Sequence, residues 1–374
     1  MEQRVYAGAL RRGWTTGSCA AAAAQAAAQL LLTGKAPEAV RLHTPGGVTF
    51  TLPVERARLG DGAAICAVRK DAGDDPDVTN GVCILAHVKK AAAGVAIEGG
   101  RGVGRVTRPG LSVPVGQAAI NPAPRAQITE AVRRAAAQAR YAGGFAVTIE
   151  AENGAELAKQ TYNAHLGVMG GISILGTSGI VEPMSEKALI DTVRLELDSL
   201  YAQGQRALLL CPGNYGADFA RDTLGLALER AVKCSNFIGE ALDHAVWRGF
   251  ARILLVGHAG KLVKLAAGVM NTHSSAADGR QEIFTAHAAL CGARRQALEA
   301  LMEAVSVDAM VEILEHENLR GPVCARIGAA VEKRLARRMG GRTRAEFIMF
   351  TNQYGVLAQS AGAAALCSEL GERK

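Results

Sequence analysis

The chain has 374 residues, a length that predicts two domains, each large enough to bury its own core. Hydrophobic residues make up 49% and aromatic residues only 4%, so we expect cores of Ala, Val, Leu and Ile. The 42 basic and 35 acidic residues give a net charge of +7, which suits an acidic small molecule and is also common on ordinary proteins. Eight cysteines without a C-x-x-C spacing indicate reduced thiols in a cytoplasmic protein, and they argue against a disulfide framework or zinc site.

An alanine-rich run extends from Ala20 to Leu32 and superficially resembles a targeting signal. Gln25 and Gln29 interrupt this run, and it is shorter than the roughly 20 residues that span a bilayer. We therefore predict a buried helix that ends at Gly34 and begins after the polar segment Thr15-Thr16-Gly17-Ser18.

The rest of the first half reads as a mixed or antiparallel sheet with one further helix. Alternation of apolar and polar residues predicts strands at 48–54 and 63–68, and a third strand is expected at 145–149. The helix is predicted over 128–140, after an extended connection marked by Pro114, Pro122 and Pro124.

Four aspartates crowd the segment 71–81, where Gly73 and Pro76 prevent a helix. Like charges raise one another's pKa, and a carboxylate with a raised pKa is suited to act as a base. The residues alone leave a solvated acidic turn as the alternative. The candidate catalytic residues are Asp71, Asp74, Asp75 and Asp77.

A strand at 95–97 is followed by Glu-x-Gly-x-Gly-x-Gly, which imitates the first motif of the common S-adenosylmethionine (SAM) methyltransferases. That motif opens directly into a helix, whereas Arg105-Val106-Thr107-Arg108-Pro109 follows here. We predict instead a glycine-rich loop that holds ligand carboxylates through Arg101, Arg105 and Arg108.

The centre of the chain has the pattern of a strand, a glycine turn and a helix. Residues 172–175 predict a short strand, Gly176-Thr177-Ser178-Gly179 follows, and a helix is expected from Glu186 to the stop at Gly204. This order is typical of a βα step, which presents backbone N–H groups and a helix N-terminus to a ligand.

Further βα steps follow, with strands predicted at 207–210, 231–233 and 252–256. They indicate a parallel sheet with ligand loops at the carboxyl ends of its strands, a helix through residue 270 and helices over the remainder. Residues 257–261 lack the Walker spacing. The histidines match no standard metal pattern, and the basic segment 323–344 fits a solvated helix face better than a nucleic-acid site.

Taken in this order, these stretches resemble one family, the cobalt-precorrin-5B C-1-methyltransferases of anaerobic cobalamin biosynthesis. Trp14 stands where the family often has another aromatic residue, and Ser18 where threonine is common. The resemblance covers about residues 8–287 and rests on Thr15-Thr16-Gly17, 71–77, 102–107, 114–124, 170–184, 212–216, 235–239, 257–264 and 271–274.

The resemblance implies a SAM-dependent methyl transfer to C-1 of cobalt-precorrin-5B, giving cobalt-precorrin-6A. It implies SAM as methyl donor, a small corrinoid substrate that brings its own cobalt, and no protein-bound metal. It implies no nucleic-acid or membrane partner, a cytoplasmic location, and it allows a homo-oligomer. The alternative is a nucleotide- or phosphate-binding α/β enzyme that acts on an acidic small molecule.

The predicted fold is α/β, with an α+β domain over 1–167 and a Rossmann-like parallel α/β domain over 168–374. The first domain is expected to bind the macrocycle and the second SAM. The aspartates would be a base, acceptors for the ribose or amino group of SAM, or a structural turn. The predicted cofactor-binding residues are Gly176, Thr177, Ser178, Gly179, Gly213, Asn214, Gly216, Gly257, His258, Gly260 and Lys261. The predicted substrate-binding residues are Thr15, Thr16, Gly17, Ser18, Arg101, Arg105 and Arg108.

Overall fold

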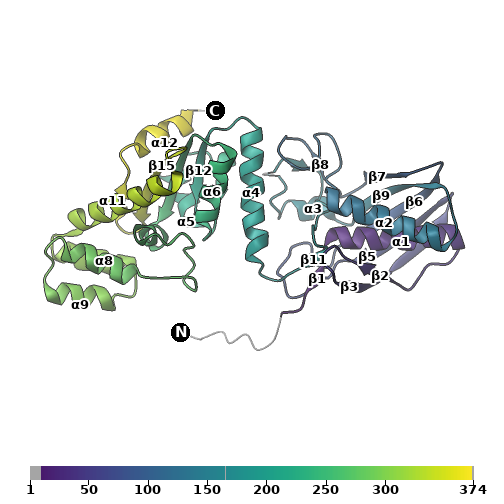
Figure 1. Cartoon of the computed structure of the whole chain (residues 1–374), viewed down its shortest axis with the longest axis horizontal. Coiled ribbons are helices and arrows are strands. Elements are labelled where there is room, and N and C mark those ends of the chain that lie inside the picture. Colours follow the sequence, from purple (N-terminus) through teal and green to yellow (C-terminus); the bar gives the residue numbers. More distant parts are fainter. Residues whose placement is uncertain (1–9, 165, 373–374) are drawn as a thin grey trace. The chain divides into compact units, whose positions relative to one another are not determined.

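The computed structural model describes residues 10–164 and 166–372, which form two compact units (Figure 1). The first unit ends at Glu186 and the second begins at Lys187, so the predicted boundary between residues 167 and 168 was wrong. Residues 168–186 belong to the first unit because their short strands pair within it. β10 (Val168–Met169) pairs with β8 (Arg105–Val106), and β11 (Ile180–Val181) pairs with β1 (Gly13–Trp14).

The sheet of the first unit has the strand order β4-β5-β6-β9-β7. All neighbours are antiparallel except β7 and β9, and a separate hairpin joins β2 to β3. The strands predicted near residues 48–54, 63–68, 95–97 and 145–149 are confirmed as β3, β5, β7 and β9. The bounds are β2 (Ala39–His43), β3 (Thr49–Pro53), β4 (Arg56–Gly60), β5 (Ala63–Arg69), β6 (Cys83–Ala91), β7 (Val95–Gly99) and β9 (Gly144–Ala151).

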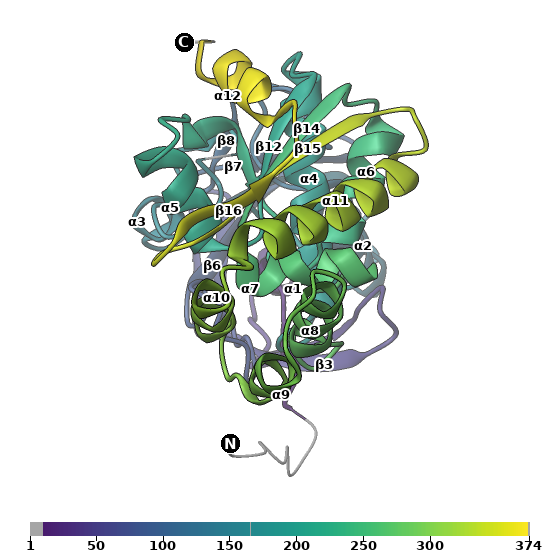
Figure 2. The ribbon, with the colours of Figure 1, turned by 90° about the vertical axis from the view of Figure 1, so that its left-hand side faces the viewer.

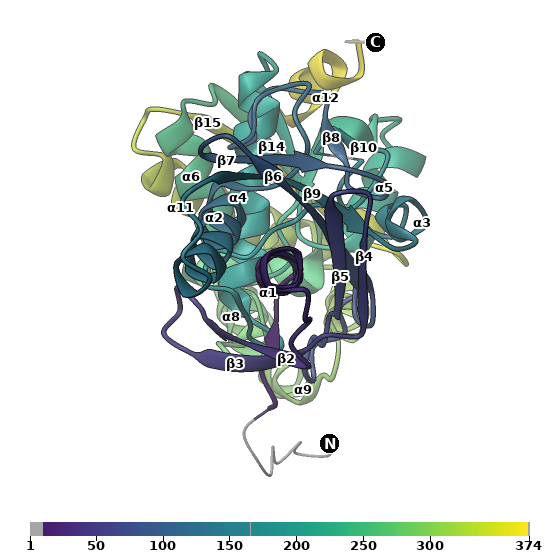
Figure 3. The same cartoon turned by 90° about the vertical axis from the view of Figure 1, so that its right-hand side faces the viewer.

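The alanine-rich helix α1 (Thr16–Thr33) is the core of the first unit, as predicted. Every residue from Thr16 to Ala28 is buried, because β5, β6 and α2 (Pro122–Gln138) surround it (Figure 3). Small side chains allow this close approach, while Gly34 adopts the left-handed conformation that ends α1. α2 starts earlier than predicted, because Pro122 takes the first helical position, where its missing N–H costs nothing.

Residues 172–175 do not form the predicted strand. Ile172 and Ile174 make single bridges to Val103 and Ile120, in a region where backbone segments touch through glycine. A Cβ on Gly102 would lie 2.0 Å from the Ala151 carbonyl oxygen, and one on Gly171 would lie 2.3 Å from the Gly102 carbonyl oxygen. The glycines of the loop after β7 are therefore explained by close backbone packing within the first unit. The short helix α3 (Gly154–Ala158) belongs to the same unit.

The second unit contains the predicted parallel sheet, in the order β13-β12-β14-β15-β16. Three of its strands confirm the prediction, namely β12 (Ala207–Cys211), β13 (Ala231–Lys233) and β14 (Arg252–His258). The prediction of helices over the remainder of the chain missed two strands, because β15 (Arg344–Thr351) joins β14 in parallel and β16 (Gly355–Gln359) adds an antiparallel edge. β15 is buried over most of its length, so it lacks the alternation that reveals a half-buried strand.

Helices cover both faces of this sheet (Figure 2). α4 (Glu186–Ala202), α6 (Ile238–Arg248) and α11 (Arg320–Met339) pack on one face, and α5 (Asn214–Asp222) and α12 (Ala363–Glu372) pack on the other. The helix predicted through residue 270 is only α7 (Ala259–Leu262) followed by a 3₁₀ turn over Val263–Ala267. The other helical segments are η1 (Leu228–Arg230), α8 (Arg280–Ala289), α9 (Arg295–Glu303) and α10 (Val307–His316).

None of the helices formed by the described residues is long and apolar enough to cross a membrane. The burial of α1 accounts for its apolar composition, because its alanines face other parts of the same unit.

The packing of α1 predicts a stability effect. Ala24 is fully buried, so Ala24→Leu should destabilise the protein by about 1–3 kcal/mol through overpacking. Urea denaturation followed by circular dichroism would measure the loss. Gln29→Leu, at a partly exposed position of the same helix, is the matched control and should cost much less. Equal stability of Ala24→Leu and wild type would contradict the close packing.

Candidate active site

The N-terminus of α1 is closed by the segment 173–179. Gly17 N–H donates to the Leu175 carbonyl oxygen at 3.0 Å, and the Ser18 hydroxyl donates to the Gly179 carbonyl oxygen at 2.8 Å. The Thr16 hydroxyl oxygen accepts from Leu175 N–H at 3.0 Å, while the Thr15 side chain caps the helix by accepting from Ser18 N–H. Their burial gives the hydroxyl groups a structural role, and contact of Thr15–Ser18 with substrate stays a prediction.

The sequence predicted that the loop Gly176-Thr177-Ser178-Gly179 follows a parallel strand. In the structure this loop lies against α1 instead. A Cβ on Gly176 would meet the Thr15 hydroxyl oxygen at 2.3 Å, and one on Gly179 would meet the Ser18 hydroxyl oxygen at 2.8 Å. The predicted cofactor-binding residues therefore divide between the two units. Residues 176–179 belong to the first, and those from Gly213 to Lys261 belong to the second.

The aspartate loop packs against the segment that leads into α1. The Asp71 carboxylate accepts from the Arg11 guanidinium at 2.5 and 2.9 Å and from Gly73 N–H at 2.8 Å. Asp74 accepts from Arg11 N–H at 2.6 Å, and Asp75 accepts from Met184 N–H at 3.0 Å. These bonds join three segments that lie far apart in the sequence.

The deepest charge in this loop is the Lys70 ammonium, which is almost fully buried. Its Nζ lies 2.5 Å from a carboxylate oxygen of Asp77, which also accepts from the N–H and the hydroxyl of Thr79, each at 2.7 Å. Burial by itself would raise the pKa of Asp77, but Lys70 and the Thr79 donors together hold it below its usual value. The Arg11 hydrogen bond likewise lowers the pKa of Asp71.

These cations overturn one sequence expectation. The four aspartates were expected to raise one another's pKa, yet the pKa values of Asp71 and Asp77 are lowered. The sequence did not reveal which cations would reach the loop, since Arg11 is 60 residues from Asp71. The contacts of the loop fit a structural turn, and a catalytic role for Asp71, Asp74, Asp75 or Asp77 stays a prediction.

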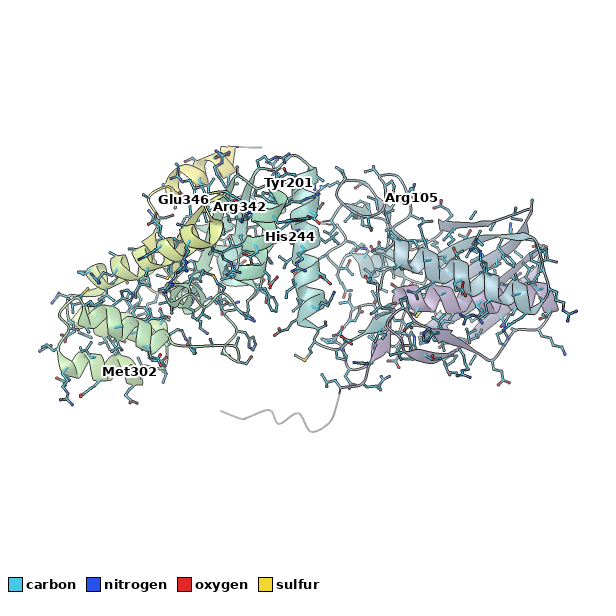
Figure 4. The ribbon with its side chains drawn as sticks, viewed as in Figure 1. Arg105, Tyr201, His244, Met302, Arg342 and Glu346 are labelled. Carbon is cyan, nitrogen blue, oxygen red and sulfur yellow. The ribbon has the colours of Figure 1, made fainter. Side chains whose placement is uncertain are left out.

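The arginines of the glycine-rich loop project from the first unit. The Arg101, Arg105 and Arg108 side chains are exposed, and Figure 4 marks Arg105 on β8. An Arg105 Nη atom donates to Glu98 at 3.1 Å and another to the Gly116 carbonyl oxygen at 3.0 Å, which steadies the guanidinium. An Arg101 Nη atom lies 3.8 Å from a carboxylate oxygen of Glu150. A carboxylate ligand could compete for these exposed forks.

The glycine loops of the second unit meet where the strand order reverses. β12 is followed by β13 on one side and β14 on the other, so the carboxyl ends of β12 and β14 define the switch point at which α/β proteins bind ligands. A Cβ on Gly257 would lie 2.8 Å from Pro212 Cγ, and one on Gly216 would lie 2.4 Å from the Val256 carbonyl oxygen. These two glycines thus allow the neighbouring loops to pack together.

Gly213 differs from the other two glycines. Its φ of +108° is open only to glycine at low cost, and its missing Cβ faces the Lys261 ammonium, whose Nζ would lie 3.3 Å away. Lys261 Nζ donates to the Ser235 carbonyl oxygen at 3.3 Å, and burial lowers the pKa of Lys261. His258 caps α7 by accepting from Gly260 N–H at 3.1 Å through Nδ1.

Two chemically important residues near these loops were missed by the sequence analysis. Lys233 ends β13, and its Nζ donates to the Asn214 side-chain oxygen at 3.2 Å. Its position at the end of a predicted strand was a usable signal. Glu196 lies on α4, and burial raises its pKa to about 7. Nothing in the apolar periodicity of α4 distinguishes Glu196 from a surface residue.

Metal-ligating side chains do not gather in the part of the chain that the structure describes, where no group of three His, Cys, Asp or Glu residues could hold an ion. His273 instead bonds to Ser275 at 2.6 Å through Nδ1. All eight cysteines are free thiols, as their spacing predicted.

The buried Lys70–Asp77 pair predicts a pH-dependent stability. Asp77→Asn should lower the free energy of unfolding by about 3 kcal/mol at pH 7, because the Lys70 ammonium then stays buried without its counter-charge. The lowered pKa of Asp77 means that the pair stabilises the fold above the usual carboxyl pKa, and that this contribution is lost as the pH falls through the lowered value. Urea denaturation at pH 7 and at about pH 3 should therefore show the difference from wild type shrinking with acid.

Asp74→Asn is the matched control for this experiment. Asp74 is exposed, and asparagine keeps an oxygen for Arg11 N–H, so the effect should stay within about 0.5 kcal/mol. Equal losses from the two variants would show that the Lys70 charge is not the cause.

Two family models match the chain. The CbiD model matches residues 3–183, and the model of the CbiD C-terminal domain matches residues 271–361. The cobalt-precorrin-5B C(1)-methyltransferase of Ruminiclostridium cellulolyticum is 47% identical, over 96% of this chain and 95% of its own length. That of Alkaliphilus metalliredigens is 42% identical, over 97% of this chain and 93% of its own.

A solved structure is also similar in sequence. The crystal structure of the cobalamin biosynthesis protein (cbiD) from Archaeoglobus fulgidus shares 33% identity, covers 71% of this chain and 83% of that chain, and has a TM-score of 0.39. The family models and the nearly full-length relatives agree with the resemblance drawn from the ordered motifs. This chain belongs to the CbiD family, the family of the cobalt-precorrin-5B C(1)-methyltransferases.

Proposed function

We infer that this protein is a C-methyltransferase of anaerobic cobalamin biosynthesis that methylates C-1 of cobalt-precorrin-5B. The observation that carries this inference is the near full-length similarity to enzymes of that name, at 47% and 42% identity. The same similarity disfavours the alternative of a nucleotide- or phosphate-binding enzyme. The cobalt belongs to the substrate.

SAM is the proposed methyl donor, and its proposed site is the carboxyl edge of the sheet in the second unit. The residues there fit one part of such a group, because Lys233 and Lys261 bring ammonium groups to the two sides of the Gly213 loop, and an ammonium can pair with the carboxylate of SAM. When bound, SAM supplies an electrophilic methyl group on a sulfonium. The chain's own contribution is to hold and align the reactants, which accounts for a large part of such a rate enhancement.

The proposed site is built from Gly213, Asn214 and Gly216 after β12, from Gly257 and His258 at the end of β14, and from Gly260 and Lys261 after it. Gly216 and Gly257 let the two loops touch, while Gly213 lies against the Lys261 ammonium. Residues 176–179 are not included in this proposal, because they pack on α1 of the first unit.

The corrinoid carboxylates are proposed to bind the exposed arginines of the first unit. Arg101, Arg105 and Arg108 are exposed and offer planar forks that match carboxylate geometry. Arg105 pairs with the exposed Glu98, and Arg101 lies at the longer distance of 3.8 Å from Glu150, so a ligand carboxylate can compete with either partner. The net charge of +7 favours the approach of a polyanionic substrate.

The proposed activity can be tested directly. The purified protein should transfer one methyl group from ¹³C-methyl-labelled SAM to cobalt-precorrin-5B, which mass spectrometry would detect, and carbon NMR should place the label on C-1. Absence of transfer by folded protein, or a label on another carbon, would contradict the proposal.

Gly213→Val should abolish SAM binding, because the new side chain would occupy the space between the loop backbone and Lys261. Isothermal titration with SAM is the measurement. Gly204→Val is the matched control, since Gly204 also has a positive φ of +88° but nothing lies near its missing Cβ. SAM affinity that falls equally in the two variants, or in neither, would move the site elsewhere.

Arg105→Ala should weaken corrinoid binding by about tenfold, the scale of a lost charge-assisted pair, and leave SAM affinity unchanged. Titration with cobyrinic acid, a stable corrin polycarboxylate, is the measurement. Arg56→Ala removes another exposed arginine of the same unit, one that pairs with Glu152 at 2.7 Å, and serves as the control. If cobyrinic acid binds both variants equally well, the glycine-rich loop does not hold the macrocycle.

A further inference from the structure

Glu196 occupies one flank of α4, next to the stripe that faces the core of the second unit. Val193 and Leu197 are buried in that core and Leu200 packs against it. At 100° per residue, Glu196 lies beside this stripe on the side opposite Arg194 and Asp198. Arg194 pairs with Glu240 and Asp198 pairs with His244, both on α6 (Figure 4 labels His244).

The groups that face Glu196 come from the ends of β12 and β13. The Lys233 ammonium favours the ionised carboxylate, and the carboxylate in turn acts on the buried Cys234 thiol, which also interacts with Cys211. Neither hydrogen bond nor ion pair engages the Glu196 carboxyl group within the described residues. The Glu196 oxygens are also absent from the buried polar atoms that lack a partner, so they stay accessible to solvent and to a ligand.

Lys233 connects this carboxyl to the Gly213 loop. Its Nζ is bonded to the side chain of Asn214, the first residue of α5. The Glu196 carboxylate and the Lys233 ammonium interact through their charges, without a direct ion pair within 4.0 Å, and Lys233 is bonded to the loop assigned to SAM. Two opposite charges held apart are complementary to an α-amino acid zwitterion, which carries an ammonium and a carboxylate on one carbon.

We propose that Glu196 and Lys233 recognise the amino-acid end of SAM, with Glu196 accepting from its ammonium and Lys233 donating to its carboxylate. This proposal rests on the proposed SAM site, and it adds which end of SAM each part of that site would bind. The amino-acid end lies toward β13 and α4, and the nucleoside end lies toward Lys261 and β14. Glu196 and Lys233 are binding residues that set specificity for a ligand with a free amino-acid group.

Proton release accompanies this recognition. Burial keeps the Glu196 carboxyl group partly protonated near neutral pH, with a pKa of about 7. A ligand ammonium favours the ionised form, so the pKa falls on binding and the proton leaves. At pH 7 the site should release roughly half a proton per bound ligand, and the release should fade above roughly pH 8, where the carboxyl is already ionised.

The test compares two ligands that differ only at the amino-acid end. S-Adenosylhomocysteine has this group, and 5′-methylthioadenosine lacks it. Isothermal titration in buffers of different ionisation enthalpy gives affinity and proton release together. We expect Glu196→Gln and Lys233→Met to bind S-adenosylhomocysteine about tenfold more weakly or worse. Their affinity for 5′-methylthioadenosine should equal that of wild type, and Glu196→Gln should release no proton.

Asp191→Asn, on the exposed face of α4 where Asp191 pairs with Lys187, is the matched control and should match wild type in every measurement. The inference is overturned if wild type binds S-adenosylhomocysteine and Glu196→Gln binds it equally well with the same proton release. It is also overturned if the Glu196 and Lys233 variants lose both ligands to the same extent. Wild-type protein that binds neither SAM nor S-adenosylhomocysteine would instead refute the proposed SAM site, a separate result.

Discussion

The first unit depends on satisfying the polar backbone groups at the N-terminus of a helix that is buried on all sides. α1 cannot leave its first N–H groups to water, because the residues around them are buried. Thr15 caps the helix, and the segment 173–179 supplies carbonyl groups to Gly17 and Ser18. These hydrogen bonds hold residues 173–179 against α1 in the first unit, and the pairing of β1 with β11 holds the residues that follow. Residues 173–179 therefore belong to the core packing of the first unit and are not the first βα step of the parallel sheet in the second unit.

The second unit is governed by the direction of its strands. Four parallel strands bring their carboxyl ends to one edge, so loops from distant parts of the sequence converge there. The glycines at this edge serve different purposes, because Gly216 and Gly257 permit contact between backbone segments, while Gly213 adopts a positive φ next to the Lys261 ammonium. Charged side chains gather at the same edge, with Lys233 and Lys261 on the two sides of the Gly213 loop.

Charge shows most clearly how neighbours change the meaning of a motif. The clustered aspartates predicted raised carboxyl pKa values, but Arg11 and Lys70 reverse the direction for Asp71 and Asp77. Glu196, an isolated carboxyl on an amphipathic helix, instead has the raised pKa, because burial against the core of the second unit desolvates the carboxylate. A carboxyl suited to proton exchange near neutral pH is therefore found away from the acidic cluster.

The sequence alone determined the buried alanine helix, most strands of both units, and the family, because periodicity and ordered motifs are local properties. It failed for β15, which is buried over most of its length, and for residues 172–175, whose bridges depend on glycine contacts with distant backbone. Only the tertiary structure decided that Gly176–Gly179 close α1, which cations neutralise the aspartates, and that Glu196 approaches Lys233. These features arise from contacts between residues far apart in the chain, and such contacts exist only once the units have folded.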